Sequence, residues 1–172
     1  ANIINKGVIT VTSAAALSRS GAVGITGGGK NLIIDNRGTV SVTALEGNQA
    51  IGIEAFGAWS NGTVSINNSG TITVSGKAAA NTFGMVAGTS KLTTSAQVVN
   101  SGTVELEGGT DLSEHRSAIY FDASNVSIPL IFENALTGVV MADDFSYVVA
   151  LDSDDSNTSA VHITNSGELR GI

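Results

Sequence analysis

An asparagine that returns about every 32 residues constrains the fold of this chain more than any other feature. Glycine follows it two residues later in five of the six copies, and four residues later in the remaining copy. Successive asparagines are 31, 32, 32, 34 and 31 residues apart. Self-similarity at such a period is typical of solenoids, in which each copy forms one structural unit stacked on the next. The repeated asparagines are Asn5, Asn36, Asn68, Asn100, Asn134 and Asn165.

Each copy contains three short segments in which apolar residues alternate with other residues. One segment lies just before the asparagine, one just after the glycine and one in mid-repeat. Alternation with a period of two is the signature of a β-strand. The sequence therefore predicts three strands per copy. Apolar pairs of the second copy are Leu32 and Ile34, Val40 and Val42, and Ile51 and Ile53; the other mid-repeat pairs are Val23 and Ile25, Phe83 and Met85, Ile119 and Phe121, and Val149 and Leu151.

A parallel coil explains the recurring asparagine better than a sandwich of hairpins does. A sandwich pairs strands that are neighbours in the sequence and needs no identical residue in every copy. In a parallel coil, equivalent side chains lie about 4.8 Å apart, so one asparagine amide can donate a hydrogen bond to the next. The glycine that follows allows the positive φ that such a corner often requires.

We therefore expect an all-β chain that forms a β-solenoid, specifically a right-handed parallel β-helix with three strands per coil. About five to six coils of 31–34 residues make a single segment, residues 1–172. Right-handedness is expected because parallel crossovers are almost always right-handed. Neither end resembles a capping unit, so we expect a fragment of a longer solenoid.

Segments that differ in length and chemistry between copies are expected to carry recognition. They map to one corner of the coil, at residues 13–21, 43–49, 75–81, 107–117 and 143–147. Insertions in solenoids usually gather on one face, which is often the binding face. Phe56 and Trp59, in a glycine-rich turn, form a second candidate, as a protein anchor or a stacking platform for a sugar. The longest and most charged segment, 107–117, offers as candidate binding residues Asp111, Glu114, His115 and Arg116.

Charge is distributed unevenly along the chain. Residues 1–103 hold six Lys or Arg and three Asp or Glu, whereas residues 104–172 hold two and twelve. The acidic half repels phosphate backbones, which argues against nucleic-acid binding and favours a basic or cation-bridged partner. No apolar run approaches the roughly 20 residues of a membrane-spanning helix, so no membrane insertion of this segment is expected.

The sequence predicts no cofactor, no metal and no catalytic residue. The glycine-rich segment 24–30 resembles a phosphate-binding loop, but Asn31 stands where Ser or Thr should hold magnesium, and a strand follows instead of a helix. The acidic segment 152–157 lacks the glycine and the distal glutamate of a calcium loop. Adjacent carboxylates such as Asp143 and Asp144 point to opposite faces of a strand, so the pair does not form a two-carboxylate site.

Two other functions remain open as alternatives to a non-enzymatic binding arm. A polysaccharide-binding or polysaccharide-degrading β-helix needs carboxylates from neighbouring coils that converge in a groove. An ice-binding solenoid needs a flat grid of outward threonines. Such a grid begins with Thr39, Ser41, Thr71 and Thr73 but is interrupted by Glu105, Met141 and Arg170.

The repeats resemble the passenger region of bacterial autotransporter adhesins, the secreted β-helical arms of type V secretion systems. The resemblance rests on segments 36–40, 68–74 and 100–104, which read Asn-Arg-Gly-Thr-Val, Asn-Ser-Gly-Thr-Ile-Thr-Val and Asn-Ser-Gly-Thr-Val, and on mid-repeat segment 50–53. It implies a virulence-associated protein exported to the bacterial cell surface and attached through a C-terminal outer-membrane barrel outside this chain. It further implies attachment to host cells or surfaces through a protein or glycan, and self-association in aggregates or biofilms.

Overall fold

The computed structural model describes residues 1–13, 21–45, 47–57, 62–76, 79–89, 93–109, 115–123, 128–144, 146–152 and 161–171. Within these ranges every helix or strand is a β-strand. A search of the same ranges finds no helix of the length and apolarity needed to cross a membrane. The chain is a β-solenoid of stacked parallel strands, as its repeat predicts.

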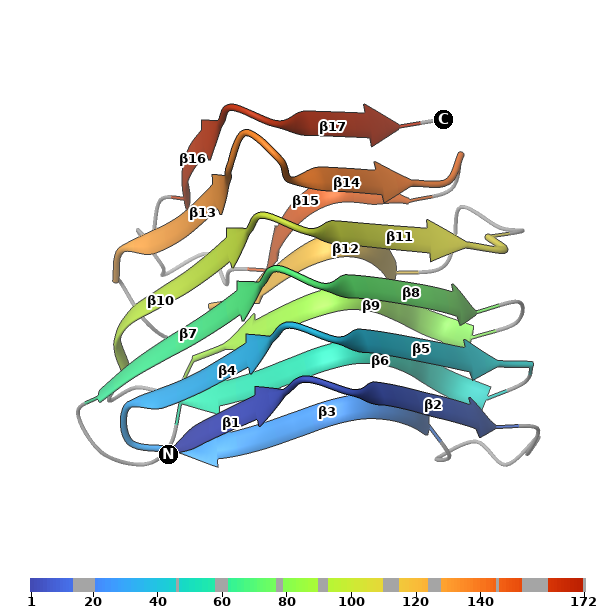
Figure 1. Cartoon of the computed structure of the whole chain (residues 1–172), viewed down its shortest axis with the longest axis horizontal. Helices are drawn as coiled ribbons and strands as arrows, with labels where there is room; N and C mark the ends of the chain where they lie inside the picture. The colour runs from blue at the N-terminus through green and yellow to red at the C-terminus, as the bar shows by residue number, and fades with distance from the viewer. Residues whose placement is uncertain are drawn as a thin grey trace.

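Three parallel sheets form the walls of the solenoid, and a full coil contributes one strand to each (Figure 1). The first sheet contains β1 (Asn2–Asn5), β4 (Leu32–Asn36), β7 (Gly62–Asn68), β10 (Thr93–Asn100), β13 (Leu130–Asn134) and β16 (Val161–Asn165). The second contains β2 (Val8–Ser13), β5 (Thr39–Ala44), β8 (Thr71–Gly76), β11 (Thr103–Glu107), β14 (Val139–Ala142) and β17 (Glu168–Gly171). The third contains β3 (Gly21–Gly29), β6 (Gly47–Gly57), β9 (Ala79–Gly88), β12 (His115–Asp122) and β15 (Tyr147–Asp152).

The path of the chain makes the coil right-handed, as expected from the preference of parallel crossovers. In Figure 1 the chain crosses the front of the molecule from left to right through β1 and β2. It then returns across the back through β3 and rises to β4, which pairs with β1 in parallel. Later coils repeat this path one strand higher each time.

The hydrophobic core fills the inside of the coil. Alternate residues of the first and second sheets point inward, and strands above and below cover them in the central coils. In the terminal strands the same positions are more open because each strand has one neighbour, so Ile163 of β16 is 53% exposed. The fully buried core residues of these two sheets include Leu32, Ile34, Val40, Ile66, Ile72, Val74, Val98, Val104, Leu130, Phe132 and Val140.

Asparagine side chains form a ladder along the corner between the first and second sheets. The Nδ2 atom of each asparagine donates a hydrogen bond to Oδ1 of the next, over 2.8–2.9 Å at all five steps from Asn5 to Asn165. In the central coils Nδ2 also donates to the carbonyl of the nearby glycine, as Asn68 does to Gly70 at 3.3 Å. Because buried amides are costly without partners, the ladder stabilises the corner that the repeat predicts.

The glycines beside the ladder are required by close approach between coils, and not by the positive φ expected from the sequence. Among the described residues, the glycines with positive φ are Gly29 and Gly108, and neither lies beside the ladder. A Cβ atom at Gly70 would lie 1.9 Å from the carbonyl oxygen of Gly38 in the coil below. At this corner the backbone of each coil lies directly on the backbone of the coil below, so there is no room for a side chain at the glycine.

Removing one rung of the ladder is expected to destabilise the fold. The substitution Asn68→Ala leaves Nδ2 of Asn36 and Oδ1 of Asn100 without their partners, at a cost of about 1–3 kcal/mol in the free energy of unfolding. Urea denaturation of purified protein measures the change. The control is Asn67→Ala on the same strand, an outward position where we expect less than about 0.5 kcal/mol. Equal urea midpoints for both variants would contradict a stabilising ladder.

The third sheet is bent, and the bend changes which residues face inward. In β6, Ile51 lies on the outer face, whereas Gly52 and Ile53 both point inward. A Cβ atom at Gly52 would lie 2.5 Å from Cγ2 of Ile72 in the second sheet. In every coil the register of strand pairing omits the position equivalent to Gly52. The bends of successive strands therefore lie one above another. The two members of a mid-repeat pair therefore do not share one face of the sheet in the first three coils. One member of each pair, Val23, Ile51 or Phe83, belongs to a separate hydrophobic cluster on the outer face.

Candidate binding face

The third sheet is bordered on both sides by connections of variable length. Connections from the first to the second sheet contain two residues, except residues 135–138. Connections that enter the third sheet correspond to the variable corner expected from the sequence. Those that leave it also vary, from residues 30–31 to residues 153–160, and the sequence interpretation missed this second variable corner.

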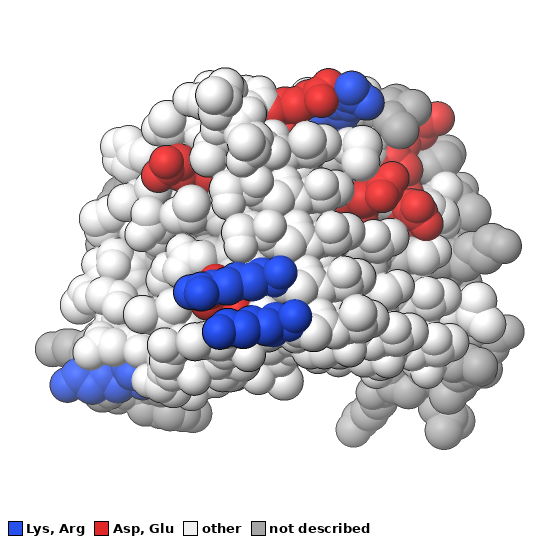
Figure 2. Space-filling model, in the orientation of Figure 1, with Lys and Arg blue, Asp and Glu red and all other residues white. Residues whose placement is uncertain are grey.

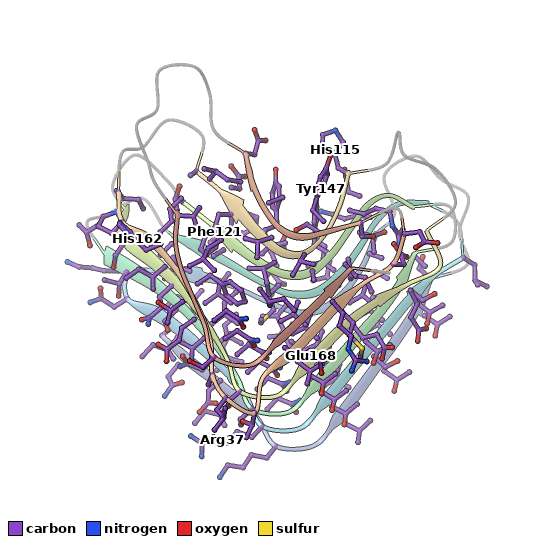
Figure 3. All side chains as sticks on the ribbon, turned by 90° about the horizontal axis from the view of Figure 1, so that it is seen from above. Arg37, His115, Phe121, Tyr147, His162 and Glu168 are labelled. Atoms are coloured by element: carbon purple, nitrogen blue, oxygen red, sulfur yellow. The ribbon has the colours of Figure 1, made fainter. Side chains whose placement is uncertain are left out.

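The outer face of the third sheet, here called the concave face, combines aromatic side chains with carboxylates. Figure 3 shows that the sheet curves inward, with His115 and Tyr147 on its outer side and Phe121 inside. The bend brings together outward residues that a flat strand would hold apart. The described members of the concave face with side chains are Val23, Thr26, Gln49, Ile51, Glu54, Phe56, Asn81, Phe83, Val86, His115, Ser117, Tyr120, Asp122, Tyr147, Ala150 and Asp152.

A small hydrophobic cluster forms the centre of the concave face. Ile51, Phe83 and Val86 are almost fully buried there, and Val23 and Tyr120 pack against them. The rings of Phe83 and Tyr120 are stacked, with centroids 4.4 Å apart. Their strands are neighbours, but their positions along the strands differ by three residues, so the bend is what allows the contact. The cluster rigidifies the outside of the sheet.

Two of the predicted binding residues, His115 and Phe56, lie on the concave face with exposed side chains. His115 begins β12 and is exposed. Phe56 is 40% exposed, and its ring lies over Gly88 of the next strand, where an added Cβ would be 2.3 Å from the ring. The predictions Asp111, Glu114 and Trp59 fall outside the described residues. Tyr147, 69% exposed, ends the variable segment 143–147 but was not among the individually named binding residues.

Arg116 was expected to be a surface contact, and the structure places it inside the solenoid. Its side chain is fully buried and occupies the inward position equivalent to Thr82 in the coil below. Nη1 donates to the Gly76 carbonyl at 2.7 Å and to Oγ1 of Thr82 at 3.0 Å. Nη2 donates to the Glu107 carbonyl and to Oδ2 of Asp143, both at 2.9 Å. Nε donates to Oγ of Ser146 at 3.1 Å.

These contacts make Arg116 a clamp between the second and third sheets. A guanidinium has five N–H groups, and among the described residues five acceptors from three successive coils surround it. Burial raises the pKa of Asp143, but hydrogen bonds from the Ser146 hydroxyl and the Gly109 N–H, together with the charge of Arg116, outweigh burial and hold that pKa below its ordinary value. Asp143 is therefore an ionised partner, and Arg116 has a structural role.

Carboxylates on one side of the concave face come from neighbouring coils. Asp122 and Asp152 are register partners on β12 and β15. The Tyr120 hydroxyl donates to Oδ2 of Asp152 at 3.0 Å. The pKa of Tyr120 is raised by burial, by this hydrogen bond and by the charges of Asp152 and Asp122. Burial also raises the pKa of Glu54, although the hydrogen bond from the Thr26 hydroxyl opposes that shift.

The sequence interpretation named only carboxylate pairs that are adjacent in the sequence, so it did not identify this pair from neighbouring coils. The signal was the coil register, which stacks Asp122 on Asp152 although they are 30 residues apart. Among the described residues, no three His, Asp or Glu side chains are arranged to hold a metal ion. The arrangement presents negative charge and aromatic rings on one surface.

The other two faces have a different character. On the outer face of the second sheet, hydroxyl side chains occupy three columns of equivalent positions, with Thr71 above Thr39, Thr73 above Ser41 and Ser75 above Thr43. This array gives way to Glu105 in β11 and Met141 in β14. Figure 2 shows few charged side chains on this side of the molecule, with most acidic ones over the later coils. The acidic half predicted from the sequence is thus one end of the stack.

Comparisons with protein-family models, with curated proteins and with solved structures found no match for this chain. The fold is therefore known from the structure alone, and the resemblance to autotransporter passengers stays a prediction from the repeated sequence.

Proposed function

We propose that this chain is part of a non-enzymatic adhesin arm on a bacterial cell surface, the passenger region of an autotransporter. In this role it attaches the cell to host cells, to surfaces or to other bacteria, through a surface protein or glycan. The stacked sheets serve as a rigid rod, and the concave face with its bordering connections serves as the binding surface.

One observation carries the proposal: the variable connections border the third sheet on both sides, while the corner opposite is nearly constant. Connections that vary on a constant scaffold are where proteins usually place recognition. The concave face between them holds Phe56 and Tyr147, which are exposed aromatic residues of the kind that dominate binding energy at interfaces.

The double variant His115→Ala/Tyr147→Ala is expected to reduce attachment severalfold. Beads coated with purified protein are applied to cultured host cells and to one another, and the bound beads are counted. Both side chains are exposed, so their removal should leave the urea midpoint within the range of surface substitutions, about 0.5 kcal/mol.

The matched control is His162→Ala/Leu136→Ala, which removes an exposed histidine and an exposed apolar residue away from the concave face. This control should attach like the original protein. A further variant replaces residues 110–114 with Gly and Ser and retains the clamp residue Arg116. Attachment that survives both the double variant and this graft would argue against the proposed surface.

A polysaccharide-binding or polysaccharide-degrading role is the second candidate, because carboxylates from neighbouring coils do lie together on the concave face. Asp122 stacks on Asp152, and Tyr120 donates a hydrogen bond to this pair. Release of reducing sugar from a polysaccharide panel, abolished by Asp122→Asn/Asp152→Asn, would favour this candidate over a non-enzymatic arm.

A further inference from the structure

Two exposed residues of the concave face adjoin the buried clamp in the sequence. His115 precedes Arg116, and Tyr147 follows Ser146. Because successive residues of a strand point to opposite faces, the inward side chain of Arg116 places His115 outward at the start of β12. Ser117 is the register partner of Tyr147, so His115 and Tyr147 are diagonal neighbours on paired strands. Figure 3 shows both residues on the outer side of the third sheet.

The clamp joins the connections of two neighbouring coils at this edge of the sheet. The connection between β11 and β12 is held where it begins, because Oδ2 of Asp143 accepts a hydrogen bond from the Gly109 N–H at 2.7 Å. It is held where it ends by Arg116, whose Nη2 atom donates to the same carboxylate oxygen at 2.9 Å. Nε of Arg116 donates to Oγ of Ser146, which stands directly before Tyr147 in the next coil. The two exposed residues are therefore linked through a single hydrogen-bonded network.

The network is closely packed and largely buried. A Cβ atom at Gly109 would lie 2.9 Å from Nε of Arg116 and from both carboxylate oxygens of Asp143. The side chains of Arg116 and Asp143 are 0% and 18% exposed. A buried network whose hydrogen bonds are satisfied is rigid and holds its groups in one geometry. The backbone at the start of β12 and of β15 is thus fixed before any ligand binds.

The stacking of coils alone does not call for an arginine at this position. The equivalent inward positions in the three coils below hold Thr82, Ala50 and Ala22, and those coils keep the same register. All three residues are buried, so the core closes there without a guanidinium. What Arg116 adds is the link between two connections that differ in length and chemistry from one coil to the next.

We propose that the clamp residues Arg116, Asp143 and Ser146 are positioning residues for the concave face. They hold His115 and Tyr147 in one preorganised arrangement, so that two neighbouring coils present a single binding element. This inference rests on the proposed function and identifies what fixes the geometry of its binding surface. Groups that are ordered beforehand lose less conformational entropy on binding, so the clamp should raise affinity without contacting the ligand.

Substituting Ser146 tests the proposal and leaves the buried ion pair in place. Ser146→Ala removes the hydroxyl that accepts from Arg116 and donates to Asp143, and it should reduce the attachment of coated beads severalfold. Ser146→Thr keeps a hydroxyl and should retain attachment. In a Tyr147→Ala background, Ser146→Ala should cause a smaller fold-loss, because one of the side chains that it positions is absent. The matched control Asn68→Ala lowers stability by removing a rung of the ladder and should attach as the original protein does.

Attachment by Ser146→Ala that equals that of the original protein would overturn the proposal. An equal fold-loss in both backgrounds would also overturn it, as would a loss that Asn68→Ala and Ser146→Thr reproduce, because such a loss follows stability and not positioning. Should Ser146→Ala fail to fold, the same comparisons are made with Asp143→Asn, which removes the charge and keeps a carbonyl acceptor for the Gly109 N–H.

The double variant His115→Ala/Tyr147→Ala separates this inference from the proposed function. If the double variant attaches fully, the proposed surface and this inference are both wrong. If the double variant loses attachment and Ser146→Ala does not, the proposed surface stands and this inference alone is overturned.

Discussion

Replacing Arg116 with methionine is expected to lower the free energy of unfolding by about 3–5 kcal/mol, the usual cost of removing one partner from a buried ion pair. Methionine has a similar length but no N–H groups, so it removes the guanidinium donor from the carbonyls of Gly76 and Glu107 and from the hydroxyl of Thr82. It also removes the cationic partner of Asp143, whose carboxylate keeps its hydrogen bonds from Gly109 and Ser146. These acceptors belong to successive coils, so the loss affects the stacking of the central solenoid. Equilibrium unfolding in urea measures the change.

The matched control is Arg170→Met, which breaks the exposed ion pair with Glu168 and is expected to cost less than about 1 kcal/mol. The pH dependence gives a second check. Asp143 has a lowered pKa in the folded protein, so its contribution is present above its ordinary pKa of about 3.9 and is lost as pH falls through the lower folded value. The Arg116→Met variant should lose part of this acid dependence. Similar urea midpoints for both arginine variants would contradict a structural clamp.

The repeat was sufficient to predict the solenoid, its parallel strands and the asparagine ladder. In a parallel stack every coil must present the same side chain at the same place, so a local pattern repeated along the chain specifies the global arrangement. The core positions of the first and second sheets followed for the same reason, since they lie at constant offsets from the asparagine. Leu32 stacks on Val64, and Val40 on Ile72, as those offsets require.

The third sheet was harder to predict because variable connections separate it from the asparagine on both sides. Its register could not be counted from a fixed residue, and the bend at Gly52 shifts the alternation by one position. The pair Ile119 and Phe121 was therefore matched to the wrong column, since Ile119 stacks on Met85. The same uncertainty in register prevented the inward position of Arg116 from being predicted. Its hydrogen bonds to Asp143 and Ser146 in the next coil explain that position.

Replacing Gly70 with alanine is expected to destabilise the protein by about 3 kcal/mol or more, at or above the upper end of the cost of overpacking. The added Cβ would lie 1.9 Å from the carbonyl oxygen of Gly38 and 2.9 Å from the carbonyl carbon of Arg37. Both contacts are with backbone, which cannot rotate away as a side chain does. Two coils would have to separate at the corner where the ladder needs them close.

The matched substitution Gly7→Ala distinguishes close stacking from a special backbone conformation. Gly7 occupies the equivalent position in the first coil, where a Cβ atom would have no neighbour within 4 Å, and neither glycine has a positive φ. If stacking alone requires glycine, Gly7→Ala should be neutral or should stabilise the fold by about 0.4–1 kcal/mol, because alanine restricts the unfolded chain. If the corner itself required glycine, both substitutions would carry a similar penalty. Urea unfolding of the two variants therefore decides whether glycine is required here by the local backbone conformation or by the close approach of neighbouring coils.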